Sequence, residues 1–261
     1  MLTGVDHLVV LARDLGAAVA AYERLGFTVT PGGEHPVGTH NALIPFVDGS
    51  YVELIAFKEP DRPHEHRWWP FLATSGGLID FALASDDLEG DLAAATARGL
   101  RFAAEEGRRL RPDRQALAWR IGRPSDPDAA LPFLIQDVTP RSLRVPEGTA
   151  RAHRNGAAGV AEVYVAVEDL NAGVLAYAAL LGAGAADALP DRRFGVEARA
   201  LECGAARIVL LPRHAVLDCL PASAQRRGPG VCAAALRAAG RTAAALDPEH
   251  AMGALLFLAP R

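Results

Sequence analysis

One pattern of glycine and aspartate spacing repeats along this chain. In each copy a glycine opens a short apolar run, an Asp-Leu pair begins ten residues later, and another glycine comes twelve or thirteen residues after the aspartate. The three copies are Gly4, Asp14 and Gly26; Gly77, Asp87 and Gly99; and Gly159, Asp169 and Gly182. A repeat of this kind predicts one supersecondary unit used several times, which constrains the fold before any functional motif is considered.

The first copy shows what this unit contains. Its opening run is short and rich in β-branched residues, which is typical of a strand, and Asp14 is suited to cap the helix that follows. Apolar residues then recur at helical spacing until Gly26, and Asp48-Gly49 is a strong hairpin signal between two later strands. We therefore predict a strand over 5–11, a helix over 15–25, a strand over 27–30 that Pro31-Gly32-Gly33 ends, and strands over 41–47 and 51–57.

The other copies predict the same β-α-β-β-β order, and the last one is incomplete. The second copy predicts a strand over 78–84, a helix over 87–98 and strands over 100–102, 115–121 and 132–137. The third predicts a strand over 161–167, a helix over 170–181 and strands over 197–202 and 207–211. A fourth copy offers strands over 231–236 and 254–259 without a long helix, so we expect a truncated unit there.

The unit predicts an α+β fold built from pairs of copies. A β-α-β-β-β unit makes a small curved sheet whose helix covers the convex face, so the concave face needs a second unit opposite it. Tandem units are therefore expected to pair into two half-open barrels, each enclosing a pocket. We predict a first domain over 1–138 (units 1–58 and 76–138), a linker over 139–158 that is rich in Pro, Arg and Gly, and a second, degenerate domain over 159–261.

Composition narrows the class of partner. Half of the 261 residues are hydrophobic, the net charge is -4, and no basic stripe is present, which disfavours nucleic-acid binding. The three cysteines lack metal-like spacing and fit a reducing compartment. Neither a signal peptide nor a membrane-spanning run is recognisable. We expect a cytoplasmic protein that acts on a small molecule, with a homodimer as one arrangement.

Four motifs follow one another in the order strand with histidine, Asp-Leu, helix with Leu-Gly-Phe, and strand with glutamate. They are Gly4-Val-Asp-His-Leu-Val-Val, Asp14-Leu15, Tyr22-Glu-Arg-Leu-Gly-Phe27 and Tyr51-Val-Glu-Leu54. This order resembles the vicinal oxygen chelate superfamily, which includes glyoxalases, bleomycin-resistance proteins and extradiol dioxygenases. Four further motifs are Gly38-Thr-His-Asn-Ala-Leu-Ile44, Arg67-Trp-Trp69, Pro132-Phe-Leu-Ile135 and His153-Arg-Asn-Gly156. With these the chain is similar, more narrowly, to bacterial glyoxalase-like domain proteins.

The resemblance implies a divalent metal on the concave sheet of the first barrel. By position its ligands are His7 and Glu53 from the first unit and Asp80 and Gln136 from the second. One imidazole with oxygen donors suits Zn²⁺, Mn²⁺, Ni²⁺ or Fe²⁺. Glu53 is also the candidate that moves a proton. The alternatives stay open: His7 as a hydrogen-bonded core residue, and Glu53 as half of a salt bridge across the barrel.

Candidate substrate contacts lie around the same pocket. His40 and Asn41 open a strand beside that of Glu53, and Trp119 and Phe133 lie on strands of the second unit. Each also has an ordinary structural explanation, as a strand start or as core packing. The segment from His64 to Trp69 places two histidines before two tryptophans, and we expect the tryptophans to form a lid or a packing anchor between the units and the histidines to be exposed.

The second half has lost most of the polar positions. Glu162 stands where the first unit has His7, whereas Ile208, Ala233 and Phe257 occupy or adjoin the other three ligand positions. We therefore predict a second half without a metal that serves structure or assembly, in which Glu162 pairs with an arginine such as Arg207.

Two functions compete. The first is a metal-dependent lyase, isomerase or dioxygenase that chelates a small vicinal-oxygen substrate in the N-terminal cup. The alternative is a metal-free protein that binds or sequesters a small molecule, as in the bleomycin-resistance branch. A purely structural or interaction role is the third interpretation.

Overall fold

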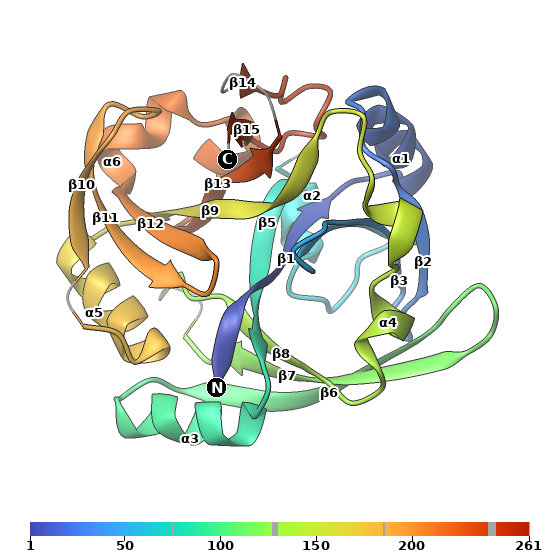
Figure 1. Cartoon of the computed structure of the whole chain (residues 1–261), viewed down its shortest axis with the longest axis horizontal. Coiled ribbons are helices and arrows are strands. Elements are labelled where there is room, and N and C mark those ends of the chain that lie inside the picture. Colours follow the sequence, from blue (N-terminus) through green and yellow to red (C-terminus); the bar gives the residue numbers. More distant parts are fainter. Residues whose placement is uncertain (75, 127–129, 185, 240–243, 261) are drawn as a thin grey trace.

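Two β-sheets packed against each other form the framework of the molecule. The structure is a computed structural model and describes residues 1–74, 76–126, 130–184, 186–239 and 244–260. Figure 1 shows the second sheet beside α5 and the first sheet above α3, with β1, β5 and β9 near the middle. The two-sheet α+β architecture agrees with the fold class predicted from the repeat.

The elements of the first half follow the predicted order. They are β1 (Leu2–Leu11), α1 (Leu15–Arg24), β2 (Thr30–Glu34), β3 (Thr39–Pro45), β4 (Tyr51–Phe57), α2 (Trp69–Leu72), β5 (Gly77–Ser85), α3 (Leu88–Ala97), β6 (Phe102–Leu110), β7 (Ala116–Pro124) and β8 (Phe133–Asp137). The segment predicted as a linker contains α4 (Arg141–Arg144) and the 3-10 helix η2 (Gly148–Arg151). The domain boundaries themselves stay a prediction.

The second half repeats the order and then shortens. Its elements are β9 (Ala157–Val167), α5 (Leu170–Leu181), β10 (Asp187–Asp191), β11 (Val196–Cys203), β12 (Ala206–Pro212), α6 (Arg213–Val216), η3 (Leu217–Cys219), α7 (Ala222–Gln225), β13 (Gly230–Ala238), β14 (Ala244–Ala245) and β15 (Leu256–Pro260). Within the described residues after β13 no helix is present, as predicted for a truncated fourth unit.

The repeated Asp and Gly residues start and stop the three long helices. Asp14 caps α1 by accepting a hydrogen bond from the backbone N–H of Ala17 at 2.9 Å, and Asp87 and Asp169 cap α3 and α5 in the same way. The glycines after these helices all have positive φ, for example 91° at Gly26, a conformation in which a Cβ would be strained. The sequence repeat is therefore a repeat of helix-capping geometry.

The first sheet closes into a ring in the order β1-β4-β3-β2-β6-β7-β8-β5. Its weakest joint is between β2 and β6, which pair only through Glu34 and Leu110. The predicted strand break at Pro31-Gly32-Gly33 is wrong, because β2 runs from Thr30 to Glu34. A proline is tolerated there because the missing N–H falls at a register shift between Pro31 and Gly33 in the pairing with β3.

A local two-fold relation links the two units of the ring. β1 and β5 lie antiparallel, with His7 opposite Ala82 and Val9 opposite Asp80. Turning the pair by half a revolution therefore exchanges His7 with Asp80 and Val9 with Ala82. This relation identifies equivalent positions in the two units better than counting along the chain does.

The outward faces of the two sheets share one hydrophobic core. Leu8 and Leu83 of the ring belong to the same buried cluster as Val163 and Leu236 of the second sheet. Two buried tyrosine hydroxyls on the helices donate across the halves, Tyr22 on α1 to the carbonyl of Ala251 and Tyr177 on α5 to that of Ala130. At about 25 cal/mol per Å² of buried apolar surface, this shared layer is a major source of stability.

The concave side of the second sheet is filled by its own side chains. Tyr164, Phe194, Val209 and Leu211 form a buried cluster there together with residues of α6, α7 and β13. Glu162 on this sheet forms ion pairs with Arg207, as predicted, and with Arg193 at 2.6 Å. The tyrosine hydroxyl of Tyr164 donates to the same carboxylate at 2.5 Å. This carboxylate is therefore fully engaged by the protein.

Candidate functional site

The ring encloses a cavity of about 280 Å³ on its concave side. This volume lies near the lower end of the range of small-molecule sites, about 300–1,000 Å³. Its walls come from six strands (β1, β3, β4, β6, β7 and β8) and the segment before α2, and α4 borders it. The lining includes His7, His35, Thr39, Asn41, Leu43, Tyr51, Glu53, Ile55, His66, Arg67, Trp68, Glu105, Gly107, Arg109, Trp119, Ile121, Arg123, Phe133, Ile135 and Arg144.

His7 and Glu53 meet inside this cavity. They lie on neighbouring parallel strands, β1 and β4, and both side chains are buried. His7 Nε2 is 3.7 Å from Glu53 Oε2. The imidazole stacks on the Tyr51 ring with centroids 4.5 Å apart, while Asn41 donates a hydrogen bond to the other oxygen of Glu53. The two side chains therefore lie close together, as their strand positions predicted. The Tyr51 ring fixes the imidazole of His7, and the Asn41 amide fixes the carboxylate of Glu53.

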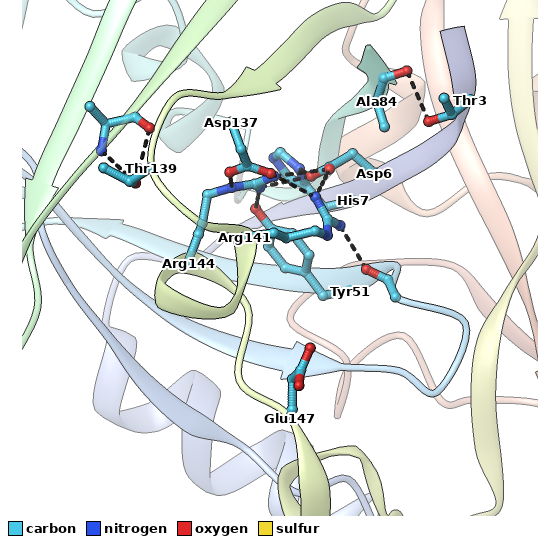
Figure 2. A network of polar contacts seen from close by, with 12 residues as sticks. Thr3, Asp6, His7, Tyr51, Ala84, Asp137, Thr139, Arg141, Arg144 and Glu147 are labelled. Carbon is cyan, nitrogen blue, oxygen red and sulfur yellow. Dashed lines mark hydrogen bonds and ion pairs between the residues drawn. The ribbon is translucent and has the colours of Figure 1, made fainter. Parts of the chain in front are cut away.

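Asp6 holds the far side of the His7 ring. Asp6 Oδ1 lies 2.7 Å from His7 Nδ1, and the carboxylate is completely buried (Figure 2). Neighbours on a strand normally point to opposite faces, but a register shift between Val5 and His7 in the pairing with β5 breaks the alternation there. A carboxylate on Nδ1 fixes the orientation of the imidazole and leaves Nε2 facing the cavity. Asp6 could not be selected from the sequence, because strand alternation places its side chain on the face opposite to that of His7.

Two arginines of α4 neutralise Asp6. Arg144 donates to both oxygens of Asp6, at 2.8 and 3.0 Å, to both oxygens of Asp137, and to the hydroxyl of Tyr51 at 2.7 Å (Figure 2). Arg141 reaches Asp6 and Asp137 from the solvent side. Burial alone would raise the pKa of Asp6, but Arg144 and the hydrogen bond to His7 outweigh it and hold the pKa well below its usual range. The predicted linker thus completes the floor of the site.

Asp80 is held by the protein rather than presented to the cavity centre. Its Oδ2 accepts a hydrogen bond from Trp68 Nε1 at 2.9 Å and forms an ion pair with Arg67. Its Oδ1 accepts from the backbone N–H of Phe81 at 2.9 Å. These partners come from the segment predicted as a lid or a packing anchor, and Trp68 is buried against residues of both units. The carboxylate therefore anchors that segment.

Phe133, rather than Gln136, occupies the position related to Glu53. Glu53 on β4 pairs with Val9, and Phe133 on β8 pairs with Ala82, the two-fold counterpart of Val9. Gln136 lies outside the cavity lining, and its side chain bonds the backbone of the loop before α3. The structure therefore does not bring Gln136 together with His7 and Glu53, and an aromatic ring stands in the fourth position.

The other predicted contacts divide by strand alternation. Asn41, Trp119 and Phe133 line the cavity, whereas His40 is absent from the lining, because β3 turns Thr39 and Asn41 inward instead. Trp119 lies over Gly107, where an added Cβ would come within 2.1 Å of the indole nitrogen. Glycine at 107 is therefore what lets this indole form a wall.

Histidines and arginines that the sequence analysis did not select also line the cavity. His35 bonds Thr39 at 2.9 Å, and burial lowers its pKa. His66 was expected to be exposed but is half-buried, and burial followed by the nearby Arg67 lowers its pKa to about 4. Arg109 is buried in the wall. None of these residues occupies a position that repeats between the units, so the repeat spacing could not predict that they line the cavity.

The residues present do not match the metal set that the superfamily implies. Two of the four positions, His7 and Glu53, offer donors to the cavity, whereas Asp80 is tied to Arg67 and Trp68 and the fourth position is Phe133. Among the described residues, no group of three or more His, Cys, Asp or Glu side chains is arranged to hold a metal ion. Transition-metal sites in proteins use three or four such ligands, so the donor set falls short.

The profile of the glyoxalase-like domain family matches residues 5–181, more than half of the chain. The chain belongs to the glyoxalase-like domain family. This membership confirms the resemblance to the vicinal oxygen chelate superfamily seen in the sequence. No curated protein sequence matches the chain. None of the helices in the described ranges is long and apolar enough to cross a membrane.

Solved structures agree on the fold. A hypothetical protein from Staphylococcus aureus is 14% identical with a TM-score of 0.67, each chain being covered completely. A mutant of 4-hydroxymandelate synthase from Streptomyces coelicolor is 12% identical with a TM-score of 0.62, over 91% of this chain and 71% of that one. A fusion protein of a xylose isomerase-like TIM barrel with 4-hydroxyphenylpyruvate dioxygenase is 20% identical, with a TM-score of 0.53, over 91% of this chain and 36% of that one. At these identities the likeness establishes architecture alone.

Proposed function

We propose that the N-terminal ring binds a small molecule without a metal and that Glu53, together with His7, moves a proton on it. The observation that carries this proposal is the replacement of the third and fourth metal positions. Asp80 is already bound by Arg67 and Trp68, and Phe133 places an apolar ring where a metal would need an oxygen ligand. This proposal develops the metal-free alternative of the sequence analysis.

The three-residue chain Asp6–His7–Glu53 supports the proton-transfer role. One proton lies between Asp6 Oδ1 and His7 Nδ1, which are 2.7 Å apart, and Arg144 keeps Asp6 ionised. His7 Nε2 and Glu53 Oε2 lie 3.7 Å apart, beyond the length of a direct hydrogen bond, and both residues line the cavity, where a ligand atom can meet them. A carboxylate or imidazole that can give up or accept a proton there is a general acid or base for a bound substrate. The reaction class is therefore proton removal or return at a substrate atom placed between these two groups.

The walls indicate the body of the ligand. Tyr51, Trp119 and Phe133 present aromatic surfaces to the cavity, with Ile121 and Ile135 between them. Such a lining binds an apolar or aromatic group through area burial and ring contacts. A small, partly aromatic molecule is the kind of ligand that this interior fits.

A metal-dependent lyase, isomerase or dioxygenase remains the second candidate. His7 and Glu53 converge, and a carboxylate behind a histidine is also the usual support of a metal-bound imidazole. Those two residues would hold the ion, which would supply Lewis-acid polarisation of substrate oxygens. The shortage of further donors places this candidate second.

Metal titration separates the candidates. Protein expressed without a histidine tag is titrated with Zn²⁺, Mn²⁺, Ni²⁺ and Fe²⁺ by calorimetry, alongside His7→Ala and Glu53→Ala. We expect the three proteins to behave alike. A stoichiometric, micromolar site that is present in the wild type and lost in both variants would overturn the metal-free proposal.

The proton-transfer role has its own test. Once a ligand is found, exchange of its acidic C–H hydrogens in D₂O is followed by NMR with wild type and Glu53→Gln. Glu53→Gln keeps the shape and the hydrogen bond with Asn41 but removes the base, so exchange should slow by about 10²-fold or more while binding persists. Equal exchange rates would reduce the role of the ring to binding.

A further inference from the structure

The Arg109 guanidinium is the one buried charge of the described cavity wall that lacks an opposite charge in contact with it. Arg109 lies on β6, where Glu105 and Gly107 also face inward, and only 4% of it is exposed. Its two hydrogen bonds go to backbone carbonyls, those of Gly32 and, at 3.3 Å, Arg144. No carboxylate of the described residues forms an ion pair with it.

Three other arginines of the wall are engaged by acids, and a fourth, Arg108, is exposed. Arg67 pairs with Asp80, Arg123 with Glu105 at 2.5 Å, and Arg144 with Asp6 and Asp137. Glu53 accepts a hydrogen bond from Asn41 and lies 3.7 Å from His7. Its charge acts on Arg109 from farther away, and the two residues form no ion pair. Among the buried charged side chains of the described wall, Arg109 is therefore the one without an ion pair.

Burial of an unpaired guanidinium is costly, because an arginine does not neutralise itself by losing a proton. Two carbonyl dipoles offset only part of that cost. A guanidinium has five N–H donors in a planar fork, so donors remain after those two bonds. A carboxylate of a bound molecule is the group that matches this fork in charge and geometry.

We infer that Arg109 binds the carboxylate of the ligand, so that the ring takes a small monocarboxylate with an apolar or aromatic body. The inference rests on the proposed function and names its substrate class. A single guanidinium balances a single negative charge. A dianionic phosphate would leave excess charge next to the carboxylate of Glu53. The body of the ligand then lies along Trp119 and Phe133, with Glu53 and His7 at one side.

The first experiment tests the anion site without assuming the body of the ligand. Thermal midpoints are measured at pH 7 and constant chloride with increasing sodium acetate or acetamide, for wild type, Arg109→Met and Arg120→Met. Arg120 lies next to Trp119 on β7 but is exposed, so this variant removes the same charge outside the cavity. Acetate should raise the midpoint of wild type and Arg120→Met but not of Arg109→Met, and acetamide should raise none. An acetate effect that is absent from wild type, or equal in all three proteins, overturns the inference.

The second experiment separates this inference from the proposed function. Binding of benzoate and phenylacetate, and of their neutral amides, is followed by tryptophan fluorescence, since Trp68 and Trp119 line the cavity. The acids should bind wild type about tenfold more tightly than the amides, and this preference should vanish in Arg109→Met. If acid and amide bind equally well, the proposed binding function stands, but the inference that Arg109 binds a ligand carboxylate is refuted. If acetate stabilises the protein but the aromatic acids bind no more tightly than acetate, the carboxylate site stands and the aromatic body of the ligand is refuted.

Discussion

Replacing Arg144 with methionine tests whether the buried ion network supports both the fold and His7. The change removes five hydrogen bonds, two to Asp6, two to Asp137 and one to Tyr51, at distances of 2.6 to 3.0 Å. Removing one partner of a buried pair costs about 3–5 kcal/mol, because the remaining charge stays desolvated. Because Arg141 still contacts Asp6, we expect Arg144→Met to lower the free energy of unfolding by about 3 kcal/mol, the lower end of that range.

Arg141→Met is the matched control. The Arg141 side chain is 36% exposed and Asp6 keeps Arg144 in that variant, so the loss should be about 1 kcal/mol or less. Free energies of unfolding are measured by urea titration, with far-UV circular dichroism as the signal. Equal stability of the two variants would show that the buried pair is not the main support.

The pH dependence gives a second readout of the same variant. The folded-state pKa of Asp6 is depressed, so its contribution is complete above the unfolded value of about 3.9 and is lost as the pH falls through the folded value. In Arg144→Met this depression should shrink. The stability gap between the two proteins should be constant above about pH 5 and narrow at lower pH. A gap that stays unchanged down to pH 2 would contradict the assignment of the effect to Asp6.

Three further predictions concern the cavity. Phe133→Glu places a carboxylate at the counterpart of Glu53 and should create a divalent-metal site measurable by calorimetry, with Phe133→Gln as the control. If the variant binds no metal, Phe133 and Glu53 are not equivalent positions. The pKa of His66 is about 4 when folded and about 6.5 when unfolded, so its stability contribution is present above 6.5 and lost toward pH 4. His66→Gln should therefore flatten the decline of stability between those values in urea titrations, and an unaltered slope would refute this. Gly107→Ala forces a methyl group against Trp119 and should cost about 1–3 kcal/mol and shift the tryptophan emission, and unchanged spectra would show that the indole lies elsewhere.

The repeat was enough to predict the units and the helix caps. Asp14 and Gly26 act through bonds within a few residues of themselves, so their roles are local and readable in sequence. His7 and Glu53 were selected because the resemblance to the vicinal oxygen chelate superfamily marks the first and last strands of a unit, and strand alternation places both side chains among apolar ones. Both signals depend on short-range geometry that tertiary contacts did not override.

The rest of the site could not be read in this way. Asp6 faces His7 because a bulge in β1 breaks the alternation, and the pairing with β5 that creates the bulge is a long-range event. Gln136 was chosen by counting to the end of a strand, whereas the pairing of β8 with β5 decides the register and puts Phe133 in that place. A shift in register changes which face every side chain of the strand occupies.

The sequence by itself determined the repeated unit, the number of long helices that cover the sheets, and the loss of polar positions in the second half, because caps and hydrophobic alternation act between near neighbours. Tertiary structure decided which charges of the cavity wall are satisfied. Arg144 reaches Asp6 and Arg67 reaches Asp80 from segments outside the strands that carry those acids, while Arg109 is left with carbonyls. The energy of a buried charge depends on the partners that folding brings within contact distance, and those partners are distant in the chain.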